Sequence, residues 1–190
     1  MVIMSVGILG GTFDPPHQAH CEISIRALNQ YNLDKVIFIP SKNPWQKSAT
    51  TSYVDRYNMT SILVQDFKNF EVSDVELYNE NNTYTVDTLQ KMSIPKNELF
   101  FILGADVAVE IKTWNRYKEL EQLTNFLIAP RDHINQNTLL NVFPFEYKLI
   151  KGEELNISSS KIRIKYEDGS DVNSLIPTDV LDYIREKKIY

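Results

Sequence analysis

Two histidines, His17 and His20, follow a glycine pair and two prolines in the stretch Gly10-Gly11-Thr12-Phe13-Asp14-Pro15-Pro16-His17-Gln18-Ala19-His20. If a helix begins near Pro16, a residue type that suits a first helical turn, the two imidazoles share one face near the helix N-terminus. The glycines allow a tight turn and a close approach of backbone to a ligand. Imidazoles and free backbone N–H groups at a helix start together indicate a phosphate site.

Other chemistries fit this stretch less well. The chain contains neither G-x-x-x-x-G-K-[ST] nor G-x-G-x-x-G, so two common phosphate-binding motifs are absent. Cys21 lies beside the histidines and could suggest zinc, but it is the only cysteine and His133 is the only other histidine. The chain therefore has few of the Cys and His ligands that a zinc site usually needs, and we expect no metal ligand in the chain.

An α/β framework is predicted around the motif. The apolar run Val6–Leu9 predicts a buried strand leading into the glycines, and Lys35–Pro40 predicts a second strand after an intervening helix. Strand, helix and strand at this spacing predict a right-handed βαβ unit. Further strands are predicted at Phe70–Val75, Glu98–Leu103, Phe126–Pro130 and Glu146–Ile150. Helices are predicted at Tyr53–Asp66, Val86–Leu89, Ser158–Tyr166 and Ile176–Tyr190, and a helical stretch is predicted after Tyr117 through Leu123. The polar segment Asp132–Pro144 predicts a loop.

Composition limits the class of protein. The chain has 190 residues and a net charge of −5, which fits one well-buried core and argues against general nucleic-acid binding. A single cysteine excludes an internal disulfide and fits a reducing compartment, and no apolar run is long enough to span a membrane. No signal-peptide pattern, repeat or linker is found, so we expect one cytoplasmic domain over residues 1–190. A polyanionic substrate would need a local positive patch, for which the candidates are His17, His20, Lys42, Lys47, Lys161, Arg163 and Lys165.

Three further segments follow predicted strands or helices and could bind a ligand. Ser41–Ser52, with Asn43-Pro44-Trp45-Gln46-Lys47 at its centre, follows a parallel strand at the end where α/β proteins bind ligands, although its composition also fits a plain surface loop. Asp106 follows another strand, and a carboxylate at such a place can hold ribose hydroxyls or metal, or can cap a helix. Trp114 could stack on a ring, although a tryptophan is more often part of a core.

Two motifs resemble those of a known superfamily. Residues 10–20 resemble the G-x-F-x-P-x-H-x-G-H signature of the HIGH-type nucleotidyltransferases, with Ala19 in place of a glycine. Ile157-Ser158-Ser159-Ser160-Lys161-Ile162-Arg163 resembles the I-S-S-T-x-I-R motif of the same superfamily. The resemblance implies a Rossmann-like α/β nucleotidyltransferase fold with a mainly parallel sheet and helices on both faces.

A third motif narrows the resemblance. Thr83-Tyr84-Thr85-Val86-Asp87-Thr88-Leu89 is similar to the [ST]-Y-T-[IV]-D-T-L segment of bacterial nicotinate-nucleotide adenylyltransferases, and the ending Ile-Pro-x-x-Val-x-x-Tyr-Ile also matches that family. The family's reaction, in NAD biosynthesis, joins ATP and nicotinate mononucleotide to give deamido-NAD and pyrophosphate, with Mg²⁺ accompanying ATP. The implied partners are these small molecules, with no nucleic acid and no membrane, and homo-oligomer formation is left open.

The same resemblance assigns site residues. It implies catalytic roles for His17, His20 and Lys47. It implies an ATP site at Gly10, Gly11, Thr12, Phe13, His17, His20, Ile157, Ser158, Ser159, Ser160 and Arg163. It implies a nicotinate mononucleotide site at Thr83, Tyr84, Thr85, Asp106, Trp114 and Arg131.

Two rival functions are weighed against this one. A phosphopantetheine adenylyltransferase of the same superfamily is disfavoured by Thr83-Tyr84-Thr85, by Trp114 and by the length of the chain. A nucleotide-binding regulatory module without catalysis is disfavoured because both histidines and Lys47 are present. No lysine or arginine lies within Thr83–Leu89, so we expect backbone N–H groups at a helix start to recognise the nicotinate carboxylate.

Overall fold

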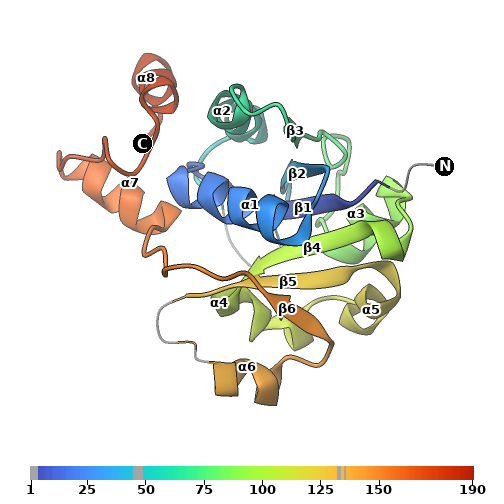
Figure 1. The fold of residues 1–190 in the computed structure, drawn as a ribbon. Coiled ribbons are helices and arrows are strands. Elements are labelled where there is room, and N and C mark those ends of the chain that lie inside the picture. Colours follow the sequence, from blue (N-terminus) through green and yellow to red (C-terminus); the bar gives the residue numbers. More distant parts are fainter. Residues whose placement is uncertain (1–3, 45–48, 132–133, 135) are drawn as a thin grey trace.

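The computed structural model describes residues 4–44, 49–131, 134 and 136–190, and a parallel sheet forms its centre (Figure 1). In the described residues the sheet has six strands in the order β3-β2-β1-β4-β5-β6. Their bounds are β1 (Val6–Gly11), β2 (Lys35–Pro40), β3 (Phe70–Val72), β4 (Leu99–Gly104), β5 (Asn125–Ala129) and β6 (Tyr147–Leu149). Each strand of this sheet pairs with its neighbours in parallel, as the sequence predicts.

The strand order reverses beside β1. Gly7 of β1 pairs with Val36 of β2 on one side, and Ile8 pairs with Phe101 of β4 on the other. The chain therefore builds outward to β3, returns to the other side of β1 and continues to β6. In an open α/β sheet, ligands bind at the carboxyl ends of the strands where the order reverses. Gly10 and Gly11 are the last residues of β1, rather than a turn after it, and Gly104 ends β4 beside them.

Helices cover both faces of the sheet (Figure 1). One face packs against α1 (Gln18–Tyr31), α2 (Tyr53–Val64), α7 (Ser159–Glu167) and α8 (Thr178–Lys187). The opposite face packs against α3 (Thr85–Met92), α4 (Ala105–Ala108), α5 (Leu120–Leu123) and α6 (Gln136–Val142). Short 3₁₀ turns lie at Lys96–Glu98, Ile111–Thr113 and Tyr117–Glu119.

Strand β2 explains why a buried parallel strand is apolar throughout. Its Val36 and Phe38 join the core under α1 and α2, whereas Ile37 and Ile39 join the core under α3. Successive side chains of a strand point to opposite faces, so both must be apolar when both faces are covered. The two-sided covering inferred from Lys35–Pro40 is confirmed.

Some predicted boundaries are wrong. The segment Asp132–Pro144 contains α6, because Leu139 and Phe143, one helical turn apart, are both buried in the core. The helical stretch predicted after Tyr117 through Leu123 is present, but as the 3₁₀ turn Tyr117–Glu119 followed by the short α5 rather than as one α-helix. Strand β3 ends at Val72, and Leu77 N–H donates to the Asp74 carbonyl in a turn soon afterwards. Helix α8 ends at Lys187, because Lys188 adopts a left-handed conformation. No helix in the described ranges is long and apolar enough to cross a membrane.

Candidate functional site

The two histidines of the first motif form one stacked unit. His17 is the N-cap of α1, so the helix begins at Gln18 and not near Pro16. The two imidazole centroids lie 3.8 Å apart, and the ring of Phe13 meets His20 edge-on at 4.9 Å. The backbone N–H of His17 donates to Nδ1 of His20 at 3.1 Å. Because Nδ1 accepts this bond, the neutral His20 ring carries its proton on Nε2.

His17 is a buried, neutral imidazole. It is 2% exposed, and burial together with the positive charge of Arg131 lowers the pKa of His17 to about 3. Its Nδ1 atom has no hydrogen-bond partner in the described part of the chain. The prediction that His17 adds to a positive patch is therefore wrong, because a desolvated imidazole loses its proton. His17 can still act as a neutral hydrogen-bond donor.

The start of α1 offers fewer free N–H groups than the sequence predicts. His17 N–H donates to His20, Gln18 N–H donates to the Leu175 carbonyl at 3.1 Å, and His20 N–H donates to the His17 carbonyl at 2.9 Å. Of these first positions, Ala19 N–H has no acceptor among the described residues. The reason is that the Leu175 loop packs over the helix end. Side chains must therefore supply most of the charge complementarity to a phosphate here.

Asp14 holds the loop between β1 and α1. It is 2% exposed, and its Oδ2 accepts from Thr50 N–H at 2.7 Å and from the Thr50 hydroxyl at 2.9 Å. Its Oδ1 accepts from the hydroxyl of Tyr190. Burial alone would raise the pKa of Asp14, but the hydroxyls of Thr51, Tyr190 and Thr50 and the Thr50 N–H lower it overall. The motif match gave Asp14 no role, and only the fold brings these donors together.

The second motif lies against the first. Ser158 caps α7, and its hydroxyl accepts from Lys161 N–H at 3.4 Å. The Ser159 hydroxyl donates to the Pro15 carbonyl at 2.8 Å, and Arg163 Nη1 donates to the Asp14 carbonyl at 2.5 Å. Ser160 is exposed in the first turn of α7. The structure thus brings the two motifs together from opposite ends of the chain.

The carboxyl ends of β4 and β5 contribute a carboxylate and an arginine. Arg131 Nη1 donates to the carbonyls of Leu155 and Ile157 at 2.5 and 3.2 Å, which fixes the segment leading into Ser158. Arg131 Nε lies 3.6 Å from Oδ1 of Asp106. Asp106 is in the first turn of α4, whose N-cap is Gly104, so Asp106 is not the cap itself. A side chain at Gly104 would overlap the Asp106 carboxylate.

The segment before α3 is joined to the loop after β2. Thr83 N–H donates to the Asn43 carbonyl at 3.0 Å, and the hydroxyls of Thr83 and Ser41 lie 2.8 Å apart. Tyr84 is the N-cap of α3. The N–H of Thr83 is therefore engaged within the protein, contrary to expectation. Among the described residues, the N–H groups of Thr85 and Val86 have no acceptor.

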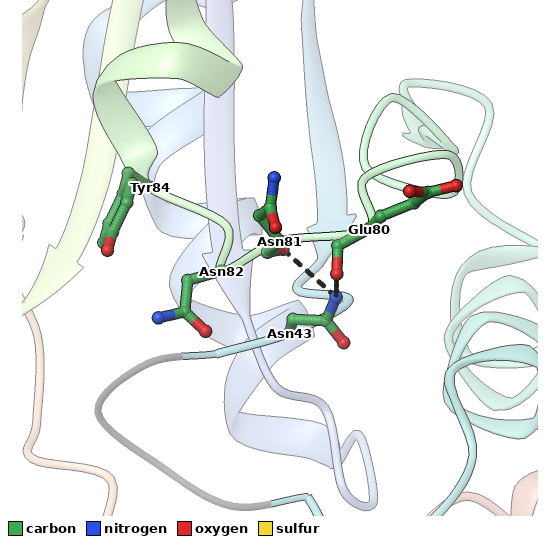
Figure 2. Close-up of a pocket in the computed structure, with 5 residues that line it drawn as sticks. All are labelled: Asn43, Glu80, Asn81, Asn82 and Tyr84. Atoms are coloured by element: carbon green, nitrogen blue, oxygen red, sulfur yellow. Dashed lines mark hydrogen bonds between the residues drawn. The ribbon is translucent and has the colours of Figure 1, made fainter.

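A polar cavity of about 480 Å³ adjoins this segment. Figure 2 shows its lining by Asn43, Glu80, Asn81, Asn82 and Tyr84. The Asn43 amide donates to the carbonyls of Asn79, Glu80 and Asn81 at 3.2, 3.4 and 3.1 Å. One asparagine side chain therefore holds the loop that leads into α3.

A buried carboxylate also joins these elements, and no motif or spacing in the sequence points to it. Glu76 is 6% exposed; its carboxylate accepts from Lys42 N–H at 3.1 Å and from the Thr88 hydroxyl at 2.6 Å. The ammonium group of Lys42 donates to the Leu77 carbonyl. The Lys42 ammonium group thus holds a turn through this hydrogen bond.

Trp114 lies on the α3 side of the sheet. Its ring meets Phe101 edge-on with centroids 6.2 Å apart, and its indole N–H is buried without a partner in the described ranges. Arg116, two residues on, pairs with Asp87 of α3 at 2.7 Å and with Glu119 at 2.9 Å. These ion pairs link the Trp114 segment to α3. Sequence reasoning missed Arg116 because Asp87 is distant along the chain.

The predicted role of Lys47 cannot be compared with the structure, because Lys47 lies outside the described residues. His133, the third histidine of the chain, also lies outside them. Within the described ranges, no three His, Cys, Asp or Glu side chains are grouped so that they could hold a metal ion. Cys21 is buried, its Sγ contacts the Leu63 carbonyl at 3.8 Å, and burial raises the pKa of its thiol to about 12.

Comparisons with known proteins agree with this geometry. The cytidylyltransferase-like family model matches residues 8–165. A curated relative from Desulfitobacterium hafniense, named "Probable nicotinate-nucleotide adenylyltransferase", is 39% identical over 97% of this chain and 95% of its own length. A relative of the same name from Clostridium botulinum is 34% identical over 97% of this chain and 96% of its own.

A solved structure extends the comparison to three dimensions. The nicotinic acid mononucleotide adenylyltransferase of Plasmodium falciparum, solved in complex with NaAD, superposes with a TM-score of 0.83. It is 25% identical, and the match covers 98% of this chain and 97% of that chain.

Proposed function

This chain belongs to the cytidylyltransferase-like family and, within it, to the nicotinate-nucleotide adenylyltransferases, and we infer that it transfers the adenylyl group of ATP to nicotinate mononucleotide. The products are deamido-NAD and pyrophosphate, and the reaction is a step of NAD biosynthesis. The observation that carries this assignment is the full-length match to relatives of that name, supported by the fold shared with a relative that binds NaAD. We take residues 1–190 to form one nucleotidyltransferase domain.

The reaction needs positioning more than covalent help. A phosphate oxygen of nicotinate mononucleotide attacks the α-phosphorus of ATP in line. A new P–O bond forms, the bond from the α-phosphorus to the bridging oxygen breaks, and pyrophosphate leaves with that electron pair. The attacking oxygen is already anionic, so no strong base is required. The protein must hold the two substrates in register and stabilise charge on the phosphoryl oxygens.

We assign the ATP phosphates to the histidine unit and to α7. A neutral His17 and the Nε2–H of His20 can donate to phosphate oxygens without a further charge being buried. Arg163 and the serine-rich start of α7 lie against the same loop. Gly10, Gly11 and Thr12 allow the nucleotide to approach the backbone at the end of β1. Lys47 is assigned to the phosphates on the motif resemblance alone.

We assign nicotinate mononucleotide to the α3 side. The Thr85 and Val86 N–H groups at the start of α3 suit the nicotinate carboxylate, since a helix N-terminus favours an anion. Trp114 supplies a ring for stacking, and Asp106 supplies acceptors for ribose hydroxyls. Arg131, beside Asp106, supplies positive charge for the nucleotide phosphate.

Magnesium enters this proposal as part of the ATP complex. Mg²⁺ prefers oxygen ligands and is often held through substrate phosphates and water. Both oxygens of the Asp14 carboxylate already accept hydrogen bonds, so this buried carboxylate is a poor ligand. The triphosphate oxygens would therefore be the main ligands of the ion, and the ion would supply shielding of their negative charge. A cytoplasmic location fits the need for ATP and the single cysteine.

The test is a comparison of acceptors. The protein is incubated with ATP, magnesium and one of nicotinate mononucleotide, nicotinamide mononucleotide or phosphopantetheine, and pyrophosphate is measured. We expect release with nicotinate mononucleotide and at least about tenfold lower kcat/KM with the amide, an effect of ~1.4 kcal/mol. Release with phosphopantetheine alone would assign the chain to the rival enzyme, and no release with any acceptor would favour the regulatory module.

A further inference from the structure

Arg56 carries a buried charge that the proposed reaction does not use. It lies in the first turns of α2, is 1% exposed and belongs to the largest fully buried side chains of the described residues. Burial lowers the pKa of Arg56 below its ordinary value, and the charge of Asp14 opposes this shift. A guanidinium keeps its proton in proteins, so a full positive charge is held in the interior. Such burial is costly unless every donor is satisfied.

Backbone carbonyls accept four hydrogen bonds from the five N–H donors of Arg56. Its Nη1 donates to the carbonyls of Thr12 and Ser41, each at 2.7 Å. Its Nη2 donates to the Lys42 carbonyl at 3.3 Å, and its Nε donates to the Thr51 carbonyl at 3.2 Å. One planar group therefore binds three separate segments: the loop after β1, the loop after β2 and the residues before α2.

Two of these segments carry opposite halves of the site. Thr12 belongs to the loop that carries the histidine unit, which we assign to ATP. Ser41 and Lys42 lead to Asn43, whose carbonyl accepts the Thr83 N–H before α3, where we assign nicotinate. The Ser41 hydroxyl also contacts the Thr83 hydroxyl at 2.8 Å. Arg56 thus donates hydrogen bonds to the backbone of both halves of the site.

We propose that Arg56 is a positioning residue that sets the separation between the ATP half and the mononucleotide half of the site. The inference rests on the proposed function, because it names the two halves by their substrates. A guanidinium has donors in a fixed plane, so carbonyls bound to it are held at fixed positions relative to one another. An in-line displacement tolerates little misplacement of the reacting atoms, so this separation bears directly on turnover.

The decisive variant is Arg56→Lys. An ammonium keeps the charge but lacks the planar fork, so it cannot hold all four carbonyls in the same arrangement. We expect kcat to fall tenfold to a hundredfold, while KM for ATP and KM for nicotinate mononucleotide each change less than threefold. Each substrate bound alone contacts one half of the site, so its KM depends little on the separation between the halves. Deamido-NAD spans both halves, so we expect its affinity in calorimetry to fall at least tenfold.

Arg26→Lys is the matched control. Arg26 of α1 also donates through Nη1 to a backbone carbonyl, that of Glu153 at 2.6 Å, but it does not bridge the two halves. We expect this variant to keep kcat and the affinity for deamido-NAD within twofold. Ser41→Ala provides a second test, because it leaves Arg56 in place and removes the hydroxyl contact with Thr83. It should weaken deamido-NAD more than either substrate.

The outcomes separate the two proposals. Wild-type protein that forms no deamido-NAD would overturn the proposed function. If the wild type is active and Arg56→Lys matches it in kcat and product affinity, the positioning role is wrong. Equal loss of affinity for all three ligands, with a lowered Tm, would make Arg56 a folding residue only and would also overturn the inference. If Arg56→Lys does not fold, Ser41→Ala is the deciding variant. Equal changes in its affinities for ATP, nicotinate mononucleotide and deamido-NAD would contradict a link between the two halves of the site.

Discussion

At the scale of single residues, His17 and His20 differ in their burial and in their hydrogen bonding. His17 is buried and neutral, whereas His20 presents a ring whose tautomer is fixed by the His17 N–H. The stacked geometry places both rings at the carboxyl edge of β1, where the strand order reverses. Donors held in fixed positions suit a transition state in which negative charge spreads over phosphoryl oxygens, because their alignment needs no reorganisation during the reaction.

His20→Ala is expected to lower kcat by a hundredfold or more, on the order of ~3 kcal/mol, as for the loss of one transition-state donor. Pyrophosphate release at saturating ATP and nicotinate mononucleotide measures this change. Gln18→Ala is the control, because Gln18 is exposed on the same helix. A folded His20→Ala enzyme with near-normal kcat would show that this ring does not contact the reacting phosphoryl group.

Buried His17 also predicts how stability depends on pH. Its pKa is about 3 in the folded protein against 6.5 for the ordinary side chain, so the unfolded chain binds the extra proton between these values. Stability is therefore full above about pH 6.5 and falls as the pH drops toward 3, with a slope approaching about 1.4 kcal/mol per pH unit. Urea unfolding at pH 7.5, 6 and 5 measures this slope, and His17→Gln should reduce it. An unchanged slope in the variant would contradict the buried neutral state.

At the scale of elements, the start of α3 allows a clean test of backbone recognition. Thr85 is the first helical residue, a position where proline is well tolerated, and Tyr84 before it has φ −113° and ψ 134°, which a residue preceding proline can adopt. Thr85→Pro should therefore fold while losing the N–H that we assign to the nicotinate carboxylate.

We expect Thr85→Pro to lower kcat/KM for nicotinate mononucleotide at least about tenfold, or ~1.4 kcal/mol, while Thr85→Ala stays close to wild type. The nicotinamide analogue should be affected less, because it lacks the anion. Steady-state kinetics with both mononucleotides, together with circular dichroism of each variant, gives the answer. Equal losses for acid and amide would mean that this N–H does not bind the carboxylate.

The elements also show what a sequence can predict. Strand β2 and helix α7 were predicted because their signals are local: a continuous apolar run, and a serine cap before a helical stretch. Helix α6 was missed because its apolar contacts depend on the fold: among the described residues of this polar segment, the buried ones are Leu139 and Phe143. The motif residues were named from resemblance, whereas Glu76 and Arg56 act through partners that only the fold brings near.

At the scale of the whole molecule, the last part of the chain supports the first motif. Helices α7 and α8 lie on the same side of the sheet as α1 and α2 (Figure 1). The Tyr183 hydroxyl donates to Asp55 of α2 at 2.9 Å and accepts from the Asn58 amide at 3.0 Å. These contacts fix α8 against α2. The residues after α8 then reach Asp14, so the loop that carries the histidines depends on the far end of the chain.

Tyr190→Phe tests this dependence. The Tyr190 hydroxyl donates to the buried Asp14 carboxylate, and burial and the Asp14 charge raise the pKa of Tyr190, which keeps its hydroxyl protonated. Losing a hydrogen bond to a charged group costs about 1.5–3 kcal/mol. We therefore expect the free energy of unfolding at pH 7, measured in urea, to fall by this amount, with a lower kcat because the loop between Phe13 and His17 loses a constraint.

The pH dependence distinguishes this hydrogen bond from simple packing. Tyr190 helps to lower the pKa of Asp14, so the folded-state pKa of that carboxyl should rise toward its ordinary value of 3.8 in Tyr190→Phe. A lowered carboxyl pKa contributes stability above the unfolded value, and that contribution is lost as the pH falls through the folded value. The difference in unfolding free energy between wild type and variant should therefore be largest above about pH 4 and shrink below it as Asp14 becomes protonated. A difference that stays constant from pH 7 to pH 3 would mean that Tyr190 supports the loop through the contacts of its ring, and that its hydroxyl contributes nothing to the charge on Asp14.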